Sequence, residues 1–283
     1  MKVAFKLLIT LALLWFIIQQ IDLKRVIATL SSVNIFYFLL AFLLYNLSKI
    51  ISAIRLNYYF KEIGIDLPLL KNLRLYYLGM FYNLFLPGGI GGDGYKAYIL
   101  KKHYNRKLTS ILKALLFDRI SGLVALIFLA ALLFLFSRYA ITPFNYLALM
   151  VAIGIYPLFY LISRKKELFM HYFTATNTLG FLVQSIQLLS ALALLFALDP
   201  SLPLIEFLVL FLISSVVSVL PITIGGVGVR ELTFLYGLKF IKLSPDSGIA
   251  FSFLFFLVTL LSSAIGILFI HNAKNLPAVS KRI

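Results

Sequence analysis

The sequence has 283 residues, of which 62% are hydrophobic and 13% are charged. A soluble domain of this size needs far more polar surface, and no stretch is polar enough for a separate nucleotide-binding or synthetase domain, so these classes are excluded. The 26 basic and 10 acidic residues give a formal net charge of +16. Most basic residues lie in short connections between apolar runs, where they indicate membrane topology, and nucleic acid is not an expected partner. The absence of cysteine excludes disulfides and thiol chemistry.

Six apolar runs are long enough to cross a bilayer, which takes roughly 20 residues. In chain order they are 3–21, 33–54, 108–136, 141–162, 177–198 and 246–270. The first run has a signal-like start, but the stretch that follows it, "FIIQQIDLKR", offers no small-residue cleavage site, so we expect an uncleaved helix. The pattern predicts an all-α polytopic membrane protein in which residues 1–283 form a single transmembrane domain.

Two shorter apolar runs, 75–86 and 207–220, end at Pro87 and Pro221. Each is followed by a glycine-rich break and a second short run. A broken pair of this kind indicates a re-entrant hairpin, which enters the membrane to mid-depth and leaves on the same side. We therefore expect re-entrant hairpins at about 75–100 and 203–240.

The distribution of basic residues predicts the orientation. With the N-terminus inside, the inner segments hold seventeen of the 26 basic residues and the outer segments hold five. This asymmetry favours a multi-pass protein of the cell (cytoplasmic) membrane with both termini cytoplasmic, provided that both short pairs are re-entrant. The first hairpin then enters from the cytoplasm and the second from the opposite face.

The two glycine-rich breaks resemble each other. "LPGGIGGDGYKA" at 86–97 aligns without a gap on "LPITIGGVGVRE" at 220–231, an offset of 134 residues that also sets Lys96 opposite Arg230. The same offset brings the long runs of the first half close to those of the second. An odd number of full spans separates each matched pair, so the halves 1–136 and 137–272 are predicted to form an inverted repeat, an architecture in which transporters bind substrate near the midplane.

A helix that restarts after a glycine-rich break presents free backbone N–H groups and the positive end of its dipole. Two such ends, entering from opposite faces, predict an anion site near mid-depth that suits a phosphate. Lys96 and Arg230 lie about one turn beyond the breaks and add positive charge. In the alternative interpretation, the glycines permit close helix packing and the prolines only end helices. The three histidines have no metal-ligand spacing, and we expect no metal, cofactor or catalytic residue.

Acidic residues also fall at membrane depth, where charges usually face a polar cavity or a partner. Asp93 lies in the first break, Glu231 beside Arg230 in the second, and Asp118 precedes Arg119 inside the run 108–136. The alternative is local neutralisation, of Asp118 by Arg119 or Lys113 and of Glu231 by Arg230.

Three further polar residues lie near or within the predicted spans. Asn83 precedes Pro87 by one helical turn, where it can satisfy a freed carbonyl or touch a ligand. Lys49 and Arg55 are expected to extend to the inner interface.

Both motifs resemble those of the lysylphosphatidylglycerol synthase transmembrane family, also called flippase-like membrane proteins. One family element resembles Asn-x-x-x-Pro-Gly-x-x-Gly-Gly-Asp followed by a basic residue, and the other resembles Pro-x-x-x-Gly-Gly-x-Gly-x-x-Glu. The acidic–Arg pair also lies where family members often carry one. These positions are the candidate substrate-binding residues: Asn83, Pro87, Gly88, Gly91, Gly92, Asp93, Lys96, Asp118, Arg119, Pro221, Gly225, Gly226, Gly228, Arg230 and Glu231.

The resemblance implies movement of lipids with phosphate-bearing head groups, such as phospholipids or polyprenyl phosphates, between leaflets. Two-domain members flip an aminoacylated phosphatidylglycerol made by an attached synthase, and this sequence shows no such domain. Anionic or phosphate-bearing lipids are therefore the expected partners. Two alternatives stay open: an intramembrane lipid-phosphate hydrolase, and a non-transporting lipid-binding subunit that recruits a separate glycosyltransferase or synthase.

Overall fold

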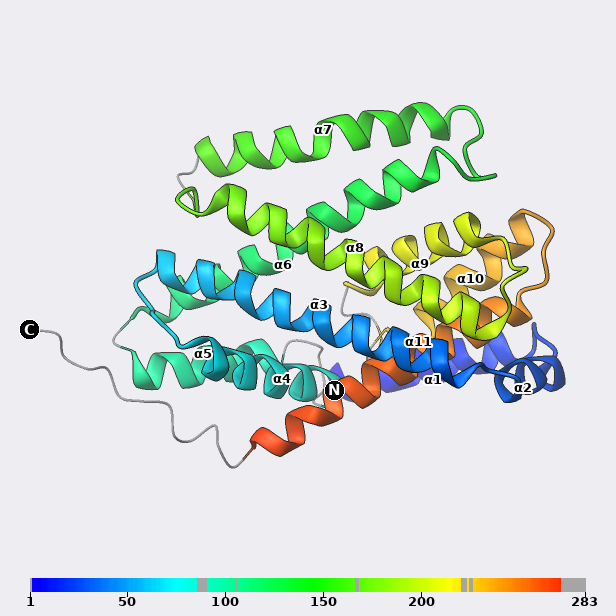
Figure 1. The fold of residues 1–283 in the computed structure, drawn as a ribbon, viewed down its shortest axis with the longest axis horizontal. Helices are drawn as coiled ribbons and strands as arrows, with labels where there is room; N and C mark the ends of the chain where they lie inside the picture. Colours follow the sequence, from blue (N-terminus) through cyan, green and yellow to red (C-terminus); the bar gives the residue numbers. More distant parts are fainter. Residues whose placement is uncertain are drawn as a thin grey trace, which may run out of the picture.

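The structure, a computed structural model, describes residues 2–85, 91–104, 106–165, 168–219, 223 and 226–270. Every regular element in these ranges is a helix, which confirms the all-α prediction (Figure 1). The elements are α1 (Lys2–Ile18), α2 (Leu23–Ser31), α3 (Ile35–Glu62), α4 (Leu69–Phe85), α5 (Gly91–His103), α6 (Leu108–Phe134), α7 (Phe144–Lys165), α8 (Phe173–Leu198), α9 (Leu204–Ser218), α10 (Val229–Phe240), α11 (Asp246–Ala264) and the 3₁₀ helix η1 (Ile265–Phe269).

Among the described residues, five helical segments are long and apolar enough to cross a membrane: α3, α6, α7, α8, and α11 continued by η1. They correspond to five of the six predicted spans and confirm the polytopic architecture. The remaining prediction, 3–21, corresponds to α1, whose 17 residues make it about 25 Å long, shorter than a hydrocarbon core of roughly 30 Å. The Asp22 side chain accepts hydrogen bonds from the N–H groups of Lys24 and Arg25 and so starts a separate helix, α2, which the sequence did not predict.

The long helices differ from the predicted spans at their ends. Helix α3 runs to Glu62 instead of ending at 54, and α8 begins at Phe173 instead of 177. Arg55 therefore lies within a helix and not at its end. The two short apolar runs, 75–86 and 207–220, correspond to helices α4 and α9.

Helices α3 and α8 form the centre of the bundle and run antiparallel. Near one end the N–H of Asn34 donates to the carbonyl of Ala197 at 2.8 Å, and further along Ser190 Oγ donates to the carbonyl of Ala41 at 2.8 Å. Buried side chains form two cores, a larger one that includes Phe207 and Phe251 and a smaller one around Tyr59 and Phe60. We call the end with the connection between α3 and α4 the α4 end, and the opposite one the α2 end.

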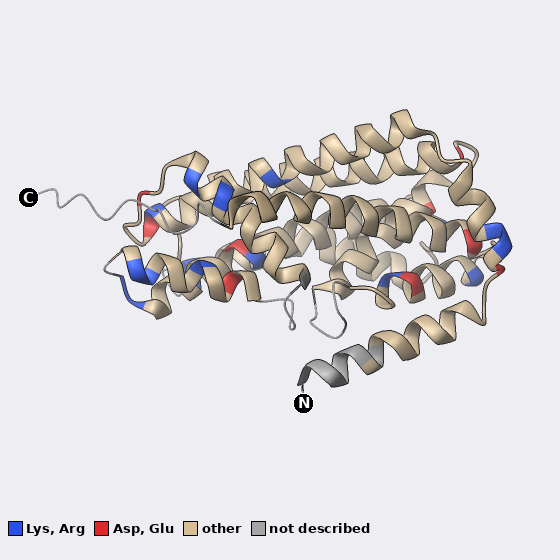
Figure 2. Ribbon diagram, turned by 90° about the horizontal axis from the view of Figure 1, so that it is seen from below, with Lys and Arg blue, Asp and Glu red and all other residues tan. Residues whose placement is uncertain are grey.

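Two helical hairpins enter this bundle from opposite ends. Helix α4 packs on α5 and helix α9 packs on α10. In Figure 1 the α4–α5 pair occupies the α4 end and the α9–α10 pair the α2 end, with the joined ends of both pairs toward the middle. On the ribbon, Lys and Arg positions lie toward both ends of the molecule, and positions of both signs of charge lie between them (Figure 2).

Candidate functional site

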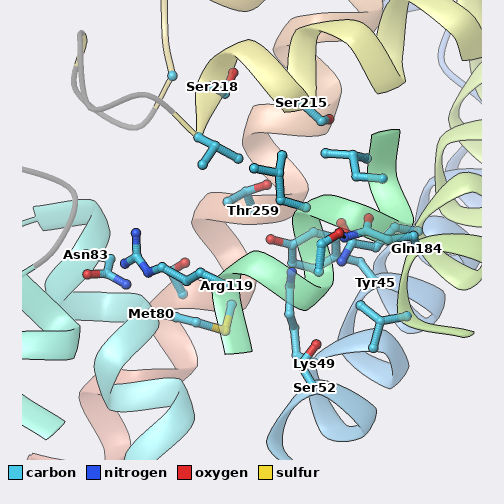
Figure 3. Close-up of a pocket in the computed structure, with 18 of the residues that line it drawn as sticks. Tyr45, Lys49, Ser52, Met80, Asn83, Arg119, Gln184, Ser215, Ser218 and Thr259 are labelled. Carbon is cyan, nitrogen blue, oxygen red and sulfur yellow. The ribbon is translucent and has the colours of Figure 1, made fainter. Parts of the chain in front are cut away.

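A cavity of about 410 Å³ lies where the two hairpins meet, and helices α3, α4, α6, α8, α9, α10 and α11 line it (Figure 3). Asn83 comes from the end of α4, Ser218 from the end of α9, and Arg230 from the start of α10. Each hairpin therefore brings its inner end to the same cavity. The remaining lining comes from the long helices between them.

The lining carries more positive than negative charge. Among the described residues of the lining, four basic side chains, Lys49, Arg55, Arg119 and Arg230, share it with one carboxylate, that of Asp118. The surrounding bundle and membrane have a low dielectric constant, so this excess attracts an anion more strongly than it would in water. The charge of the lining favours an anionic ligand.

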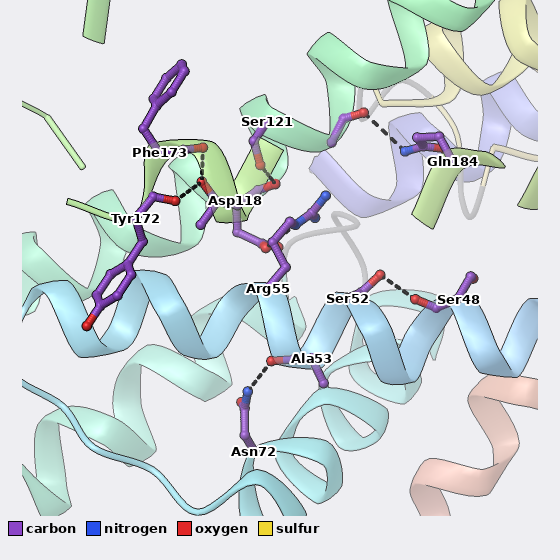
Figure 4. A network of polar contacts seen from close by, with 12 residues as sticks. Ser48, Ser52, Ala53, Arg55, Asn72, Asp118, Ser121, Tyr172, Phe173 and Gln184 are labelled. Atoms are coloured by element: carbon purple, nitrogen blue, oxygen red, sulfur yellow. Dashed lines mark hydrogen bonds and ion pairs between the residues drawn. The ribbon is translucent and has the colours of Figure 1, made fainter. Parts of the chain in front are cut away.

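Arg55 is buried, and its Nε lies 2.8 Å from Asp118 Oδ1 on α6 (Figure 4). Gly122 and Gly180 leave room for the guanidinium, because a Cβ at either glycine would lie 3.1 or 3.3 Å from Arg55 Nη1. That Nη1 atom has no hydrogen-bond partner in the described part of the chain. The prediction that Arg55 extends to the interface is wrong, since its carboxylate partner holds it inside the bundle beside the cavity.

Asp93, at the start of α5, binds two cations. Arg119 Nε lies 2.5 Å from Asp93 Oδ2, and Lys96 Nζ lies 3.3 Å from Asp93 Oδ1. Lys96 also sits 4.6 Å above the ring of Tyr76 and lies outside the cavity lining. Because Asp118 bonds to Arg55 and Arg119 to Asp93, local neutralisation of Asp118 by Arg119 or Lys113 is not what the structure shows. The two neighbours on α6 bind partners on different helices.

The start of α5 is capped by the preceding helix. Asn83 Oδ1 accepts a hydrogen bond from the N–H of Gly92 at 2.8 Å, so in the described structure this side chain caps the start of α5. A Cβ at Gly92 would collide with the carbonyl of Gly79, so this glycine permits the close packing of α4 on α5. Gly91 begins α5, and neither glycine belongs to the cavity lining.

The start of α10 is built differently, on two glycines with positive φ. Gly226 has φ +79° and Gly228 has φ +89°, a backbone region that suits glycine. The Glu231 carboxylate accepts hydrogen bonds from the N–H of Gly228 at 2.6 Å and from Ser252 Oγ at 2.8 Å. Glu231 is thus a buried cap of α10 and forms no ion pair with Arg230 in the described structure.

Arg230 and Lys49 reach the cavity without a carboxylate partner among the described residues. Arg230 lies 4.6 Å from the ring centroid of Phe255, and its Nε has no hydrogen-bond partner in that part of the chain. Lys49 Nζ lies 4.3 Å above the ring of Tyr45. The prediction that Lys49 extends to the interface is also wrong, because it lines the cavity instead.

A sequence signal for Lys49 and Arg55 does exist. Tyr45, Lys49 and Ser52 recur at helical spacing along one face of an apolar helix, and Arg55 continues that face. A polar stripe on a span marks a face turned toward a cavity.

The predicted site residues thus fall into separate groups. Five of them line the cavity: Asn83, Asp118, Arg119, Gly226 and Arg230. Asp93 joins it through Arg119, while Lys96, Gly91, Gly92, Gly228 and Glu231 support the hairpins around it. Pro87, Gly88, Pro221 and Gly225 lie outside the described residues. Within the described ranges, no three His, Asp or Glu side chains gather closely enough to hold a metal ion.

The sequence is similar to known proteins. The family model described as "Lysylphosphatidylglycerol synthase TM region" matches residues 3–176 and 174–266. The chain belongs to this family. Membership agrees with a lipid-related role in the membrane.

A curated relative also shares part of this sequence. UPF0104 membrane protein PH1989 of Pyrococcus horikoshii is 28% identical to this family member over 131 residues, which cover 46% of this chain and 38% of that protein. The similarity therefore spans less than half of either protein.

Proposed function

We propose that this protein moves a phosphate-bearing lipid between the leaflets of the membrane and holds the head-group phosphate in the central cavity. The observation that carries the proposal is that two cations of the lining, Arg230 and Lys49, have no carboxylate partner in the described chain. The Nη1 atom of Arg55, whose Nε is paired with Asp118, is also without a hydrogen bond there. Unpaired charges inside a membrane bundle are costly and mark ion or substrate sites. Guanidinium groups suit phosphate oxygens because they donate several hydrogen bonds from a planar group.

The arrangement of the helices supports transport by an inverted repeat. With the 134-residue offset of the two glycine motifs, α3 corresponds to α8, α4 to α9, α5 to α10 and α6 to α11 with η1. The hairpins come from opposite ends and both reach the cavity. In our proposal both are re-entrant, and rocking of one half against the other exposes the cavity to each leaflet in turn.

Arg119 has the best position to exchange partners during this cycle. Its side chain is 35% exposed and lines the cavity, while its Nε contacts the less exposed carboxylate of Asp93. An incoming phosphate competes with Asp93 for this guanidinium, and Asp93 keeps Lys96 as its second cation. Asp93 therefore tunes the charge of the site.

The proposal is tested by lipid movement in proteoliposomes, with fluorescent lipids that carry phosphate-bearing or phosphate-free head groups. We expect faster movement of the phosphate lipids, and about tenfold slower movement in Arg230→Ala because a charge-assisted contact is lost. Arg25→Ala is the matched control, since that arginine is exposed at the α2 end and lies outside the cavity.

Two results would redirect the proposal. Tight lipid binding without movement of any lipid would favour the non-transporting recruiting subunit. Release of inorganic phosphate from the lipid would favour the hydrolase.

A further inference from the structure

The cavity offers no carboxylate to a positively charged substituent of a head group. Asp118 is the one carboxylate in the described lining, and Arg55 occupies it at 2.8 Å. Asp93, behind Arg119, is bound by that arginine and by Lys96. An ammonium group entering this cavity would lose its hydration and find only neutralised acids, at a cost in free energy.

The aromatic side chains of the lining are also poorly placed to bind a cation. Tyr45, Tyr76 and Phe255 are the aromatic residues of the described lining. Each ring already carries a cation of the chain itself, with Lys49 over Tyr45, Lys96 over Tyr76 and Arg230 over Phe255. A ring has a second face, but the resident cations repel a second cation that approaches it.

Neutral hydrogen-bonding groups, by contrast, are free. Gln187, Ser215 and Ser263 line the cavity, and their side chains form no hydrogen bond with the rest of the described chain. Thr223 is buried in the same lining, and its Oγ1 is also without a partner there. Hydroxyl and amide groups both donate and accept, as a ligand hydroxyl does. These groups line the cavity and can exchange hydrogen bonds with hydroxyl groups of a ligand.

We infer that the cavity selects head groups in which the phosphate is joined to a hydroxyl-bearing group, such as glycerol, inositol or a sugar, and disfavours head groups that carry an ammonium. This inference rests on the proposed lipid site and names its substrate class. The phosphate binds the unpaired cations, and the hydroxyls bind the free neutral groups.

Equilibrium binding to the purified full chain in detergent micelles tests the selectivity. The probes are phosphatidylglycerol, phosphatidylethanol and phosphatidylethanolamine with identical acyl chains, since their head groups differ by hydroxyls and by an ammonium. We expect phosphatidylglycerol to bind about fivefold more tightly than phosphatidylethanol, from roughly one net hydrogen bond. Phosphatidylethanolamine should bind still more weakly. Equal affinities for phosphatidylglycerol and phosphatidylethanolamine would overturn the inference.

A carboxylate placed in the cavity should change this order. Gln187→Glu supplies an unpaired acid to the lining, and we expect it to narrow the preference for phosphatidylglycerol over phosphatidylethanolamine about tenfold. Gln19→Glu is the matched control, because the same change falls on an exposed residue outside the lining. Ser215→Asp serves as a second variant if Gln187→Glu does not fold. An unchanged preference in a folded cavity variant contradicts the inference.

Two further probes separate this inference from the proposed function. If diacylglycerol, which lacks phosphate, binds as tightly as phosphatidylglycerol, the proposed phosphate site itself fails. Soluble glycerol phosphate distinguishes a lipid from a free phosphate ester. If it displaces phosphatidylglycerol with equal affinity, the ligand is soluble and the lipid assignment is overturned. If only the ammonium discrimination is absent, the phosphate site stands and the selectivity does not.

Discussion

Asp118 and Arg119 follow each other in the sequence but serve different helices. The carboxylate binds Arg55 on α3, whereas the guanidinium binds Asp93 on α5. Successive side chains on a helix point about 100° apart, so neighbours of opposite charge can each reach a separate partner. Helix α6 is thereby joined to α3 and to the first hairpin by buried or half-buried ion pairs.

The Arg55–Asp118 ion pair should contribute to the stability of the fold. Asp118→Asn leaves a buried cation without its carboxylate, and we expect a loss of about 3 kcal/mol in the free energy of unfolding. The double variant Arg55→Met/Asp118→Leu removes both charges and should recover most of the loss. Unfolding in mixed micelles measures both. Asp66→Asn, an exposed control, should change little. A double variant as unstable as the single one would argue against an isolated ion-pair effect.

At the scale of elements, each hairpin has its own way of starting its second helix. Helix α5 receives its cap from Asn83 on the preceding helix, whereas α10 caps itself through Glu231 after two glycines with positive φ. Ser252 on α11 shares the Glu231 carboxylate and ties the second hairpin to the bundle. Glu231, which the sequence places among the candidate substrate-binding residues, therefore stabilises the start of α10 and its contact with α11.

The hydrogen bonds of Glu231 should stabilise the second hairpin. Glu231→Gln leaves one amide oxygen for two donors, so we expect a loss of about 1 to 2 kcal/mol in the free energy of unfolding. Ser252→Ala removes one of the two bonds and should cost less. Lipid affinity of the folded variants should equal that of the wild type. A large loss of affinity in well-folded Glu231→Gln protein would return Glu231 to the ligand site.

At the scale of the whole molecule, the long axis has two distinct ends. Lys61, Lys101, Lys107 and Arg164 belong to the segments at the α4 end, and Lys24 belongs to the α2 end (Figure 1). The positive-inside rule predicts that the α4 end faces the cytoplasm. The cavity between the two ends then lies within the membrane.

Orientation can be tested by labelling, because the natural chain has no cysteine. Lys24→Cys and Lys107→Cys place single thiols on exposed residues of opposite ends. With an impermeant maleimide on intact cells, we expect labelling of Lys24→Cys at once and of Lys107→Cys only after permeabilisation. The cysteine-free chain is the control. The reverse pattern would show that the predicted orientation is wrong.

The membrane class, the long helices and the ends of the short helices follow from the sequence alone. These features depend on local composition, namely the length of an apolar run and the position of proline and glycine. Residue types that suit an anion were also visible locally, since Arg119 and Arg230 lie at membrane depth. The inverted repeat and the orientation remain predictions from the same patterns.

The pairing of the charges, by contrast, depends on how the helices pack in three dimensions. Arg55 and Lys49 have similar sequence surroundings, yet Arg55 meets Asp118 on another helix, whereas Lys49 lies over the ring of Tyr45 and meets no carboxylate in the described chain. The physical reason is that partner choice depends on the rotation and offset of helices distant in sequence, and a local pattern does not carry that information. Glu231 shows the same limit, because its role depends on Ser252 on the neighbouring helix.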